Sequence, residues 1–514
     1  MEKASVNNEL LQDLVYKESM TIEQVVDKTV KRLNLRLFLL YWAALSTALN
    51  SGAVAYVTVI TGNIPYKDWK CSSDKCASLY AEMSEEEDFF TQKTMCDNEM
   101  EAGKDFTWTT NKLTFTTDWN IYCKEESRLA TISGSFFIGA IAGLLCSTGL
   151  FDRIGRKKGA IVGGVITIVA TAASCVAPNY QALLAFRIVS GFGLLINYTG
   201  VYCWVIEYAP MGLRNVAAGF FNISWSISYL ILVLLGYLID DWKYLYLALT
   251  VVCVISTAMF FVVPLPESPR FHLVRGMEKE AKENIISFFR ITRNEFSFDN
   301  INLVYEERAQ NYLEQLSDFK KYPCLLKRAL LCMTCWFLVS LITYAYTVGW
   351  SKIGSDLFTS YLFAALGDAL GYVSAIPICR LLGRKRATIC LFGGIAVMNF
   401  IAMLNVDITD TWTIEQIASL LGSVATSGTF SMVYLYTGEL APTSHRGMIV
   451  CLSSSCAQFG SIFGAYVSLL YGVTDRRVPL ALFAGLSVCG CVAVLFLPDT
   501  TGKGIPETPK DLVN

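Results

Sequence analysis

The residue with the clearest potential for chemistry in this chain is an acid inside an apolar stretch. Asp368 lies near the middle of the mostly apolar run 354–379, and no Lys, Arg or His lies beside it between Lys352 and Arg380. A carboxylate at membrane depth is costly unless something offsets its charge, and such groups mark functional sites by default. The position predicts either a counter-charge for a bound cation or a structural group. A structural Asp368 would bond a neighbouring helix while protonated, or would pair with Arg187 from another run.

Aromatic side chains in two other apolar runs are candidates to surround a cation. They are Phe221 and Trp225 in one run, and Trp336, Phe337, Tyr344, Tyr346 and Trp350 in and just after the other. Phe221 and Trp225 are four residues apart and Phe337 and Tyr344 are seven apart, so each pair shares a helix face. Aromatic faces near one carboxylate suit an organic cation through cation–π attraction. Ordinary core packing explains each aromatic separately, so only their convergence on Asp368 would favour a site.

The sequence contains no set of residues typical of an enzyme or a metal centre. The two histidines, His272 and His445, lie outside the apolar runs. No phosphate-binding Gly-x4-Gly-Lys-Ser/Thr loop, no His-Glu-x-x-His and no pair of Cys-x-x-Cys ligand sets is present. We therefore predict no catalytic residues, no cofactor and no metal, and the missing nucleotide loop argues against an ATP-driven pump. The formal net charge of −2 gives no reason to expect a nucleic-acid partner.

Two charged motifs each occur twice at almost the same spacing. The turn around Arg153 lies 227 residues before its repeat around Arg380, and the motif that starts at Glu207 lies 232 residues before its repeat at Glu439. Two unrelated motif pairs with one shared spacing indicate a duplicated unit, and duplicated halves in a membrane protein are typical of a transporter. We predict that inter-helix charge contacts of these motifs form a gate. The predicted gating residues are Asp152, Arg153, Arg156, Glu207, Arg214, Arg380, Arg384, Glu439 and Arg446.

Composition and apolar runs predict an all-α membrane protein. The chain has 514 residues, of which 53% are hydrophobic and 17% charged, whereas a soluble domain is nearer a quarter charged. A membrane-spanning helix needs about 20 apolar residues. Twelve runs qualify: 37–60, 128–150, 159–177, 181–206, 215–238, 243–265, 327–349, 354–379, 387–405, 413–438, 447–471 and 478–498. Six precede the polar segment 266–326 and six follow it, which predicts two pseudo-symmetric six-helix bundles, 37–265 and 327–498.

The distribution of Lys and Arg predicts which side of the membrane each segment faces. Ten basic residues lie in the turns after the second, fourth, eighth and tenth runs, and four lie in the short loops on the other side. Because basic loops stay in the cytoplasm, we expect the termini (1–36 and 499–514) and the linker 266–326 to be cytoplasmic in the plasma membrane. No signal-peptide pattern is present. Residues 21–36 predict a short amphipathic helix, either on the inner membrane surface or in solvent.

The segment 62–127 is then expected outside the cell. It holds fourteen acidic residues and seven lysines, a net charge of −7. Its four cysteines predict two disulfides on this oxidising side, with three pairings open. The alternative is that these cysteines are free thiols in a flexible loop. The four residues are Cys71, Cys76, Cys96 and Cys123.

The chain resembles the organic cation/anion/carnitine transporter branch of the major facilitator superfamily. The turn from Asp152 to Lys157 is shared across that superfamily, and more specific marks are the cysteine-bearing loop, Pro266-Glu-Ser-Pro-Arg270, Trp336-Phe337 and the ending from Leu497 to Pro506. The resemblance covers nearly the whole chain. It implies a central cavity between two six-helix halves in a lipid bilayer, alternating access, and a cytoplasmic gate latched by the turns at 152–158 and 380–386.

The resemblance also bears on the charge of the substrate. Asp368 falls where this family usually has an acidic residue. Anion-preferring members have a Lys where this chain has Tyr372 and an Arg where it has Gln458, and cation-preferring members have an Asp at that second place. The resemblance thus implies a carrier of small organic ions, with cations favoured, and Tyr372 and Gln458 join Asp368 and the aromatics as predicted binding residues.

Two alternatives to a cation carrier are open. One is a carrier of zwitterions such as carnitine, or of a neutral solute. The other is a non-transporting membrane receptor or scaffold that kept the fold, although gate motifs in both halves argue against it. The sequence does not predict an oligomeric state.

Overall fold

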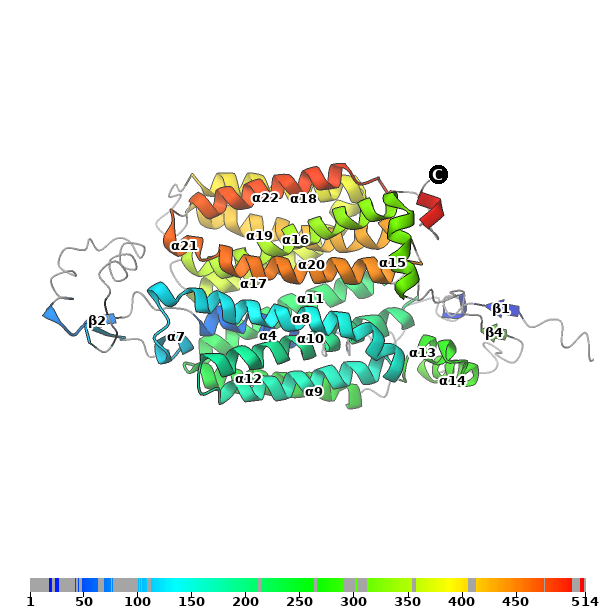
Figure 1. The fold of residues 1–514 in the computed structure, drawn as a ribbon, viewed down its shortest axis with the longest axis horizontal. Helices are drawn as coiled ribbons and strands as arrows, with labels where there is room; N and C mark the ends of the chain where they lie inside the picture. The colour runs from blue at the N-terminus through cyan, green and yellow to red at the C-terminus, as the bar shows by residue number, and fades with distance from the viewer. Residues whose placement is uncertain are drawn as a thin grey trace, which may run out of the picture.

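Long helices lie side by side through most of the chain (Figure 1). In this computed structural model the described residues are 49–62, 112–210, 214–262, 266–289, 301–303, 312–353, 357–404, 413–442, 444–475, 477–501 and 509–512, with parts of 18–26, 42–45, 69–76 and 100–108.

The helices form two bundles. The first contains α4 (Ser51–Thr61), α8 (Ser127–Ile154), α9 (Arg156–Cys175), α10 (Tyr180–Tyr208), α11 (Arg214–Leu238) and α12 (Trp242–Val262). The second contains α16 (Pro323–Ile353), α17 (Leu357–Leu382), α18 (Arg384–Ala402), α19 (Ile414–Leu440), α20 (Arg446–Val467), the short α21 (Leu470–Val473) and α22 (Arg477–Leu495). The bundles meet where α8 packs on α20 and where α11 packs on α17.

The described helices agree with the predicted runs. Eleven helices in the described part of the chain are long and apolar enough to cross a membrane, and their ends lie within four residues of the predicted ends. The first predicted run is described as a helix only over its last part, α4, and at residues 42 and 45. The all-α membrane fold is therefore confirmed.

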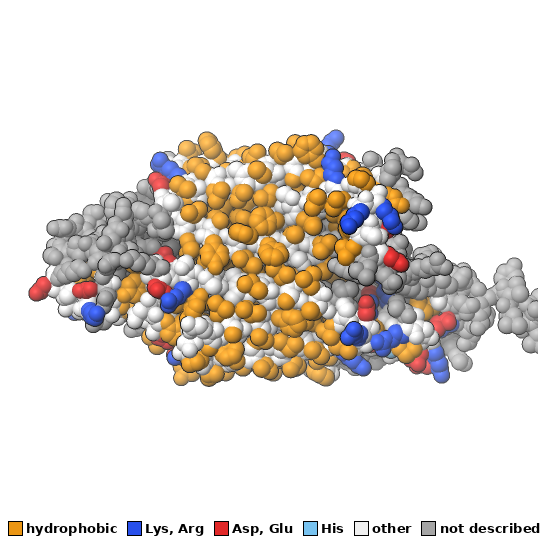
Figure 2. All heavy atoms as spheres, in the orientation of Figure 1, with side chains coloured by type: hydrophobic (Ala, Val, Ile, Leu, Met, Phe, Trp, Pro, Cys, Tyr) orange, Lys and Arg blue, Asp and Glu red, His pale blue; other side chains and the backbone are white. Residues whose placement is uncertain are grey.

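Apolar side chains cover the outside of the bundles along most of their length. Figure 2 shows this belt between two ends at which Lys, Arg, Asp and Glu gather. Leu381, Phe261 and Val169 are 83%, 72% and 63% exposed, which would be costly in water and is favourable in lipid. Helices suit this setting because each one satisfies its backbone hydrogen bonds internally, where lipid offers none.

We name the two ends of the bundles by what they carry. The loop end carries the described parts of 69–119, and the linker end carries the α8–α9 turn and the short helices of the linker (Figure 1).

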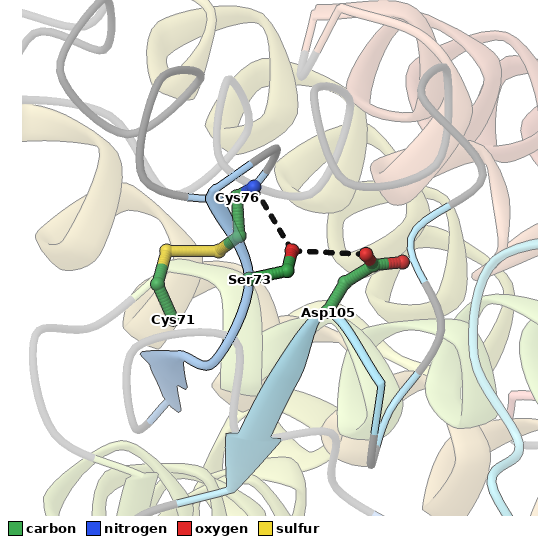
Figure 3. Close-up of a disulfide and its surroundings, with 4 residues drawn as sticks. All are labelled: Cys71, Ser73, Cys76 and Asp105. Carbon is green, nitrogen blue, oxygen red and sulfur yellow. Dashed lines mark hydrogen bonds between the residues drawn. A yellow bond between two sulfur atoms is a disulfide. The ribbon is translucent and has the colours of Figure 1, made fainter.

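A small disulfide-linked structure lies at the loop end. Strand β2 (Trp69–Cys71) pairs antiparallel with β3 (Phe106–Trp108). A disulfide joins Cys71 to Cys76, and between them the Ser73 hydroxyl donates to Asp105 Oδ1 over 3.0 Å (Figure 3). Cys123, which begins the short helix η1 (Cys123–Glu125), is also disulfide-bonded. The predicted disulfides are thus confirmed for these three cysteines, and Cys96 lies outside the described residues.

The end of the loop is anchored on the first bundle. The Leu113 N–H donates to the Asp240 carbonyl over 2.8 Å, and the Trp242 N–H donates to the Leu113 carbonyl over 3.1 Å. The indole of Trp242 donates to Asp118 in α7 (Phe115–Asp118) over 2.9 Å. The last part of the loop is therefore held against the turn between α11 and α12.

At the linker end, part of the N-terminal segment packs on the linker. Strand β1 (Glu18–Met20) pairs in parallel with β4 (Ile301–Leu303). Val25 and Val26 are 0% and 2% exposed, in one cluster with apolar residues of α14 (Glu278–Phe289). These two valines face protein, so the expectation of a helix on the membrane surface or in solvent is wrong for them. The apolar side chains of α14 remove these valines from water, which is the role that the membrane was expected to play.

Another linker helix, α15 (Tyr312–Lys321), docks on the second bundle near the tail helix η3 (Pro509–Leu512). Asp318 in α15 lies 3.4 Å from Nε2 of His445, which precedes α20. Burial lowers the pKa of His445, and the neighbouring Asp318 acts in the opposite direction.

Small residues allow close helix contact in the first bundle. A Cβ atom at Gly139 of α8 would lie 1.8 Å from the carbonyl oxygen of Ile188 in α10, whereas nothing lies within 4 Å of a Cβ at Gly149 in the same helix. Close contact of two backbones is the usual device for packing helices in lipid.

This difference gives a matched test of the fold. Gly139→Ala should lower the unfolding temperature of the purified protein clearly, because the backbones must move apart, at about 1–3 kcal/mol. Gly149→Ala should leave that temperature unchanged or raise it slightly, since Ala favours a helix. Equal unfolding temperatures for the two variants in a detergent melting assay would contradict the packing described.

Candidate functional site

Asp368 lies where the sequence placed it, near the middle of α17. It is 7% exposed, and the hydroxyl of Ser427 in α19 donates to its Oδ1 over 2.5 Å. Among the residues that the structure describes, no Lys, Arg or His side chain contacts this carboxylate. Its charge in the ionised form is therefore offset by one hydroxyl alone.

A small cavity opens beside Asp368. It is lined by residues of three helices of the second bundle: Thr343, Tyr346, Thr347 and Trp350 in α16, Ala364 and Asp368 in α17, and Ser423 and Thr426 in α19. Its volume of about 10 Å³ has room for roughly one water molecule. The space beside the carboxylate is therefore small.

Arg187 is not the partner of Asp368. This buried guanidinium donates to the backbone carbonyls of Val54, over 2.5 Å, and Ala55, over 3.0 Å, in α4. It also lies over the ring of Phe136, 4.7 Å from its centre. Arg187 is thus held inside the first bundle, and the internal ion pair considered from sequence does not form.

Two of the predicted aromatic residues, Tyr346 and Trp350, line the cavity together with Asp368. Tyr346 is fixed by a 2.7 Å hydrogen bond from its hydroxyl to Asn399, and the indole of Trp350 donates to Ser423 over 3.1 Å. Hydrogen bonds of this kind hold each ring in one orientation beside the carboxylate.

Three more predicted residues lie close by without lining the cavity. Tyr344 meets two rings of the first bundle, Tyr56 at 6.0 Å and Phe137 at 4.9 Å. Trp225 meets the same Tyr56 edge-on at 5.9 Å. Asp368 is near enough to act electrostatically on Tyr56 and on Tyr372. These rings form an aromatic contact between the bundles next to the site.

Other predicted binding residues face elsewhere. Phe337 packs against Phe463 of α20 at 5.8 Å, and Phe221 against Tyr198 at 4.2 Å within the first bundle. Gln458 is half-buried, and none of the described contacts joins it to the cavity. The spacing of residues along a helix predicts which of them share a face. It does not predict which neighbouring helix that face contacts.

The charged motifs form one cluster in each bundle at the linker end. In the first, Arg156 lies 3.3 Å from Glu207 and 3.7 Å from Asp152, and the Ser268 hydroxyl donates to Glu207. In the second, Arg384 lies 3.0 Å from Glu439. The hydroxyl of Thr500 donates to the same Glu439 over 2.7 Å. Each glutamate is thus held by an arginine and a hydroxyl.

These contacts join helices of the same bundle, α9 to α10 and α18 to α19. The remaining motif residues differ in their exposure. Arg153 and Arg380 are exposed, and the backbone carbonyl of Arg153 accepts from Arg275. Arg446 is half-buried, and the side chain of Arg214 lies outside the described residues.

Comparison with known protein families identifies the family of this chain. Residues 49–353 match the family model described as Sugar (and other) transporter, and residues 329–513 match that of the Major Facilitator Superfamily. The chain belongs to the sugar (and other) transporter family. The two matches overlap and together extend from the start of α4 into the tail. They therefore include both bundles.

Similar proteins indicate the branch of the transporter family that this chain resembles. The chain is 26% identical to organic cation/carnitine transporter 2 of Homo sapiens over 77% of this chain and 71% of that protein. It is 25% identical to the organic cation transporter protein of Drosophila melanogaster, over 77% and 73%. It is 28% identical to solute carrier family 22 member 7 of Rattus norvegicus, over 78% and 75%. The resemblance to the organic cation/anion/carnitine branch is confirmed.

Solved structures agree on the fold. The proton:xylose symporter XylE bound to 6-bromo-6-deoxy-D-glucose superposes with a TM-score of 0.62 at 15% identity, covering 93% of this chain and 99% of that one. An inward-open conformation of XylE from E. coli superposes with a TM-score of 0.59 at 14% identity, covering 93% and 99%. At this identity the likeness shows the fold alone.

The sequence contains a further repeat with the same spacing. Ser268 and Thr500, the hydroxyls of the two clusters, are 232 residues apart, the same spacing as Glu207 and Glu439. The prolines that precede them, Pro266 and Pro498, share this spacing, and their carbonyls accept from Trp204 over 3.1 Å and Tyr436 over 2.5 Å. The segment after the last helix of each bundle is therefore part of its cluster.

Removing one partner of a cluster tests its role in this transporter. Arg156→Ala should lower the transport rate while the protein still reaches the cell surface, because Glu207 keeps a half-buried charge without its arginine. Glu207→Gln added to Arg156→Ala should recover part of the rate, with a coupling of about 1–3 kcal/mol between the two changes. Lys279→Ala, which removes an exposed lysine of α14 at the same end of the bundles, is the control and should transport normally. Strictly additive effects of the two changes would contradict the pairing.

Proposed function

We propose that this chain carries small organic cations across the membrane as a secondary transporter, and that Asp368 is the counter-charge of the bound cation. One observation carries the proposal: a mid-helix carboxylate borders a cavity and is contacted by a hydroxyl but, in the described part of the chain, by no basic side chain. A cation that enters the cavity would offset a charge that the protein leaves exposed to it.

The rest of the lining supports a cation over an anion. Trp350 and Tyr346 place aromatic rings in the same wall, and rings attract cations through their negative faces. Arg187, a buried basic residue that could serve an anion, donates to two backbone carbonyls of the first bundle instead. This also weighs against a zwitterion, whose carboxylate would need a second, free positive group.

Alternating access follows from the two-bundle architecture. Each bundle is tied internally by its Arg–Glu–hydroxyl cluster, whereas the contacts between bundles beside the site include ring contacts, such as Tyr56 with Tyr344, and the 3.4 Å bond from the Tyr361 hydroxyl to the Val59 carbonyl. Two rigid bodies with a soft interface can rock about a site between them. The small cavity would widen as the bundles rock and so admit the cation.

At the loop end the bundles are also in contact. The ammonium of Lys112, from the segment before α7, lies over the ring of Phe358 in α17, 4.0 Å from its centre. The Thr131 and Tyr466 hydroxyls are 3.0 Å apart across α8 and α20. In the proposed cycle these contacts would open when the site faces the loop end.

We also propose that the linker end is cytoplasmic and that the membrane is the plasma membrane. The excess of Lys and Arg in the turns of the linker end supports the orientation. The disulfide of Cys71 and Cys76 at the opposite end supports an oxidising, extracellular side there.

Removal of one charge tests the proposal. Asp368→Asn keeps the shape of the side chain and removes its charge. It should raise the KM for an organic cation by at least about tenfold, since an uncompensated charge interaction inside a low-dielectric site is strong, and should leave a neutral analogue nearly unaffected. Uptake into oocytes, normalised to surface protein, measures both.

Asp240→Asn is a suitable control. Asp240 is an exposed carboxylate at the loop end, 3.6 Å from Lys112 and remote from the cavity lining. It should leave the KM within about twofold of wild type. If Asp368→Asn also leaves the KM for the cation unchanged, Asp368 is not the counter-charge.

A further inference from the structure

The threonines around Asp368 have already used their only hydrogen. Thr343 donates to the Val339 carbonyl over 2.7 Å, Thr347 to that of Thr343 over 2.9 Å, and Thr426 to that of Gly422 over 2.7 Å. A hydroxyl has one hydrogen and two lone pairs. Each of these side chains therefore offers the cavity lone pairs rather than a hydrogen, and the Tyr56 hydroxyl also lies within hydrogen-bonding reach of Thr347.

Two other donors of the lining are engaged as well, whereas none of the described bonds uses the hydrogen of Ser423. The Trp350 indole N–H goes to Ser423 and the Tyr346 hydroxyl to Asn399. The hydroxyl of Ser427, behind the carboxylate, goes to Asp368 itself. In the lining that the structure describes, lone pairs of hydroxyl oxygens and of one carboxylate thus outnumber available hydrogens.

An acceptor-rich wall matches some cations better than others. A protonated amine or a guanidinium has N–H groups that can bond both the carboxylate and a threonine oxygen, and such charge-assisted bonds are strong. A quaternary ammonium ion has none, so its methyl groups would leave the buried oxygens without a partner. A site built to bond an N–H rejects an analogue that lacks it.

We propose that the site selects cations that carry N–H groups, protonated amines and guanidines, over quaternary ammonium ions. The inference rests on the proposed function and names the substrate class of that same site. The nitrogen of the cation donates one N–H to the carboxylate of Asp368 in α17. It donates a second N–H to the hydroxyl oxygen of Thr347 in α16.

A matched ligand series tests this in the wild-type protein. Phenethylamine, its N-methyl form and its N,N,N-trimethyl form share one skeleton and one positive charge, and they differ in the number of N–H groups. Inhibition of the uptake of a labelled amine should be at least about tenfold weaker for the trimethyl form than for phenethylamine, because one lost hydrogen bond to a charged group is worth about that factor.

A substitution locates the effect. Thr347→Val keeps the shape and removes the acceptor, so it should weaken phenethylamine by about tenfold, leave the trimethyl form unchanged and thus remove the discrimination. Thr347→Ser keeps the hydroxyl and should retain it. Thr334→Val is the matched control, because Thr334 lies in the same helix with the same kind of bond, to the Leu330 carbonyl over 2.9 Å, but is exposed on the outside.

The outcomes separate this inference from the proposed function. If the trimethyl form inhibits as well as phenethylamine in the wild type, the selection for N–H groups is wrong. It is also wrong if Thr347→Val weakens both ligands equally. In both cases the counter-charge stands provided that Asp368→Asn weakens both ligands. If none of the cations is bound, or Asp368→Asn changes neither affinity, the proposed function itself fails.

Discussion

A charge inside a lipid-surrounded helix bundle costs free energy unless a partner offsets it, and this constraint organises the whole molecule. Arg187 is offset by two backbone carbonyls and an aromatic ring, and Glu207 and Glu439 by an arginine and a hydroxyl each. Asp368 differs, because the partner that the structure describes for it is a single hydroxyl. The remaining charge borders the cavity, where a mobile ligand can supply what the protein does not.

The same constraint explains why the two bundles can behave as separate bodies. The strong polar contacts at the linker end, Arg156 with Glu207 and Arg384 with Glu439, lie within each bundle. Beside the site the bundles meet through rings such as Tyr56, Tyr344 and Phe137, whose contacts are individually weak and have little directional demand. Each bundle thus carries its own charged cluster, and the carboxylate of Asp368 lies in the second bundle next to the interface.

The sequence predicted the helices well and the partners of side chains less well. Each membrane-crossing run is long and nearly continuous, so its ends could be placed within a few residues. The position of Asp368 followed from its helix alone. Phe337 and Phe221 were placed on the correct helices, but their neighbours depend on how helices pack, which spacing within one helix does not determine. The partner of Glu207 is likewise 51 residues away along the chain, at Arg156. The 232-residue spacing of Ser268 and Thr500 was a visible signal of the clusters.

We propose that the carboxylate of Asp368 is the counter-charge of the transported cation. A structure of the protein with a bound cation would test this proposal. Electron cryo-microscopy of the protein with phenethylamine should place the ligand nitrogen about 2.7–3.2 Å from an oxygen of Asp368. The ring of the ligand should lie against Trp350 or Tyr346. A ligand nitrogen bound elsewhere, with the Ser427–Asp368 pair undisturbed and no cation beside it, would contradict the account.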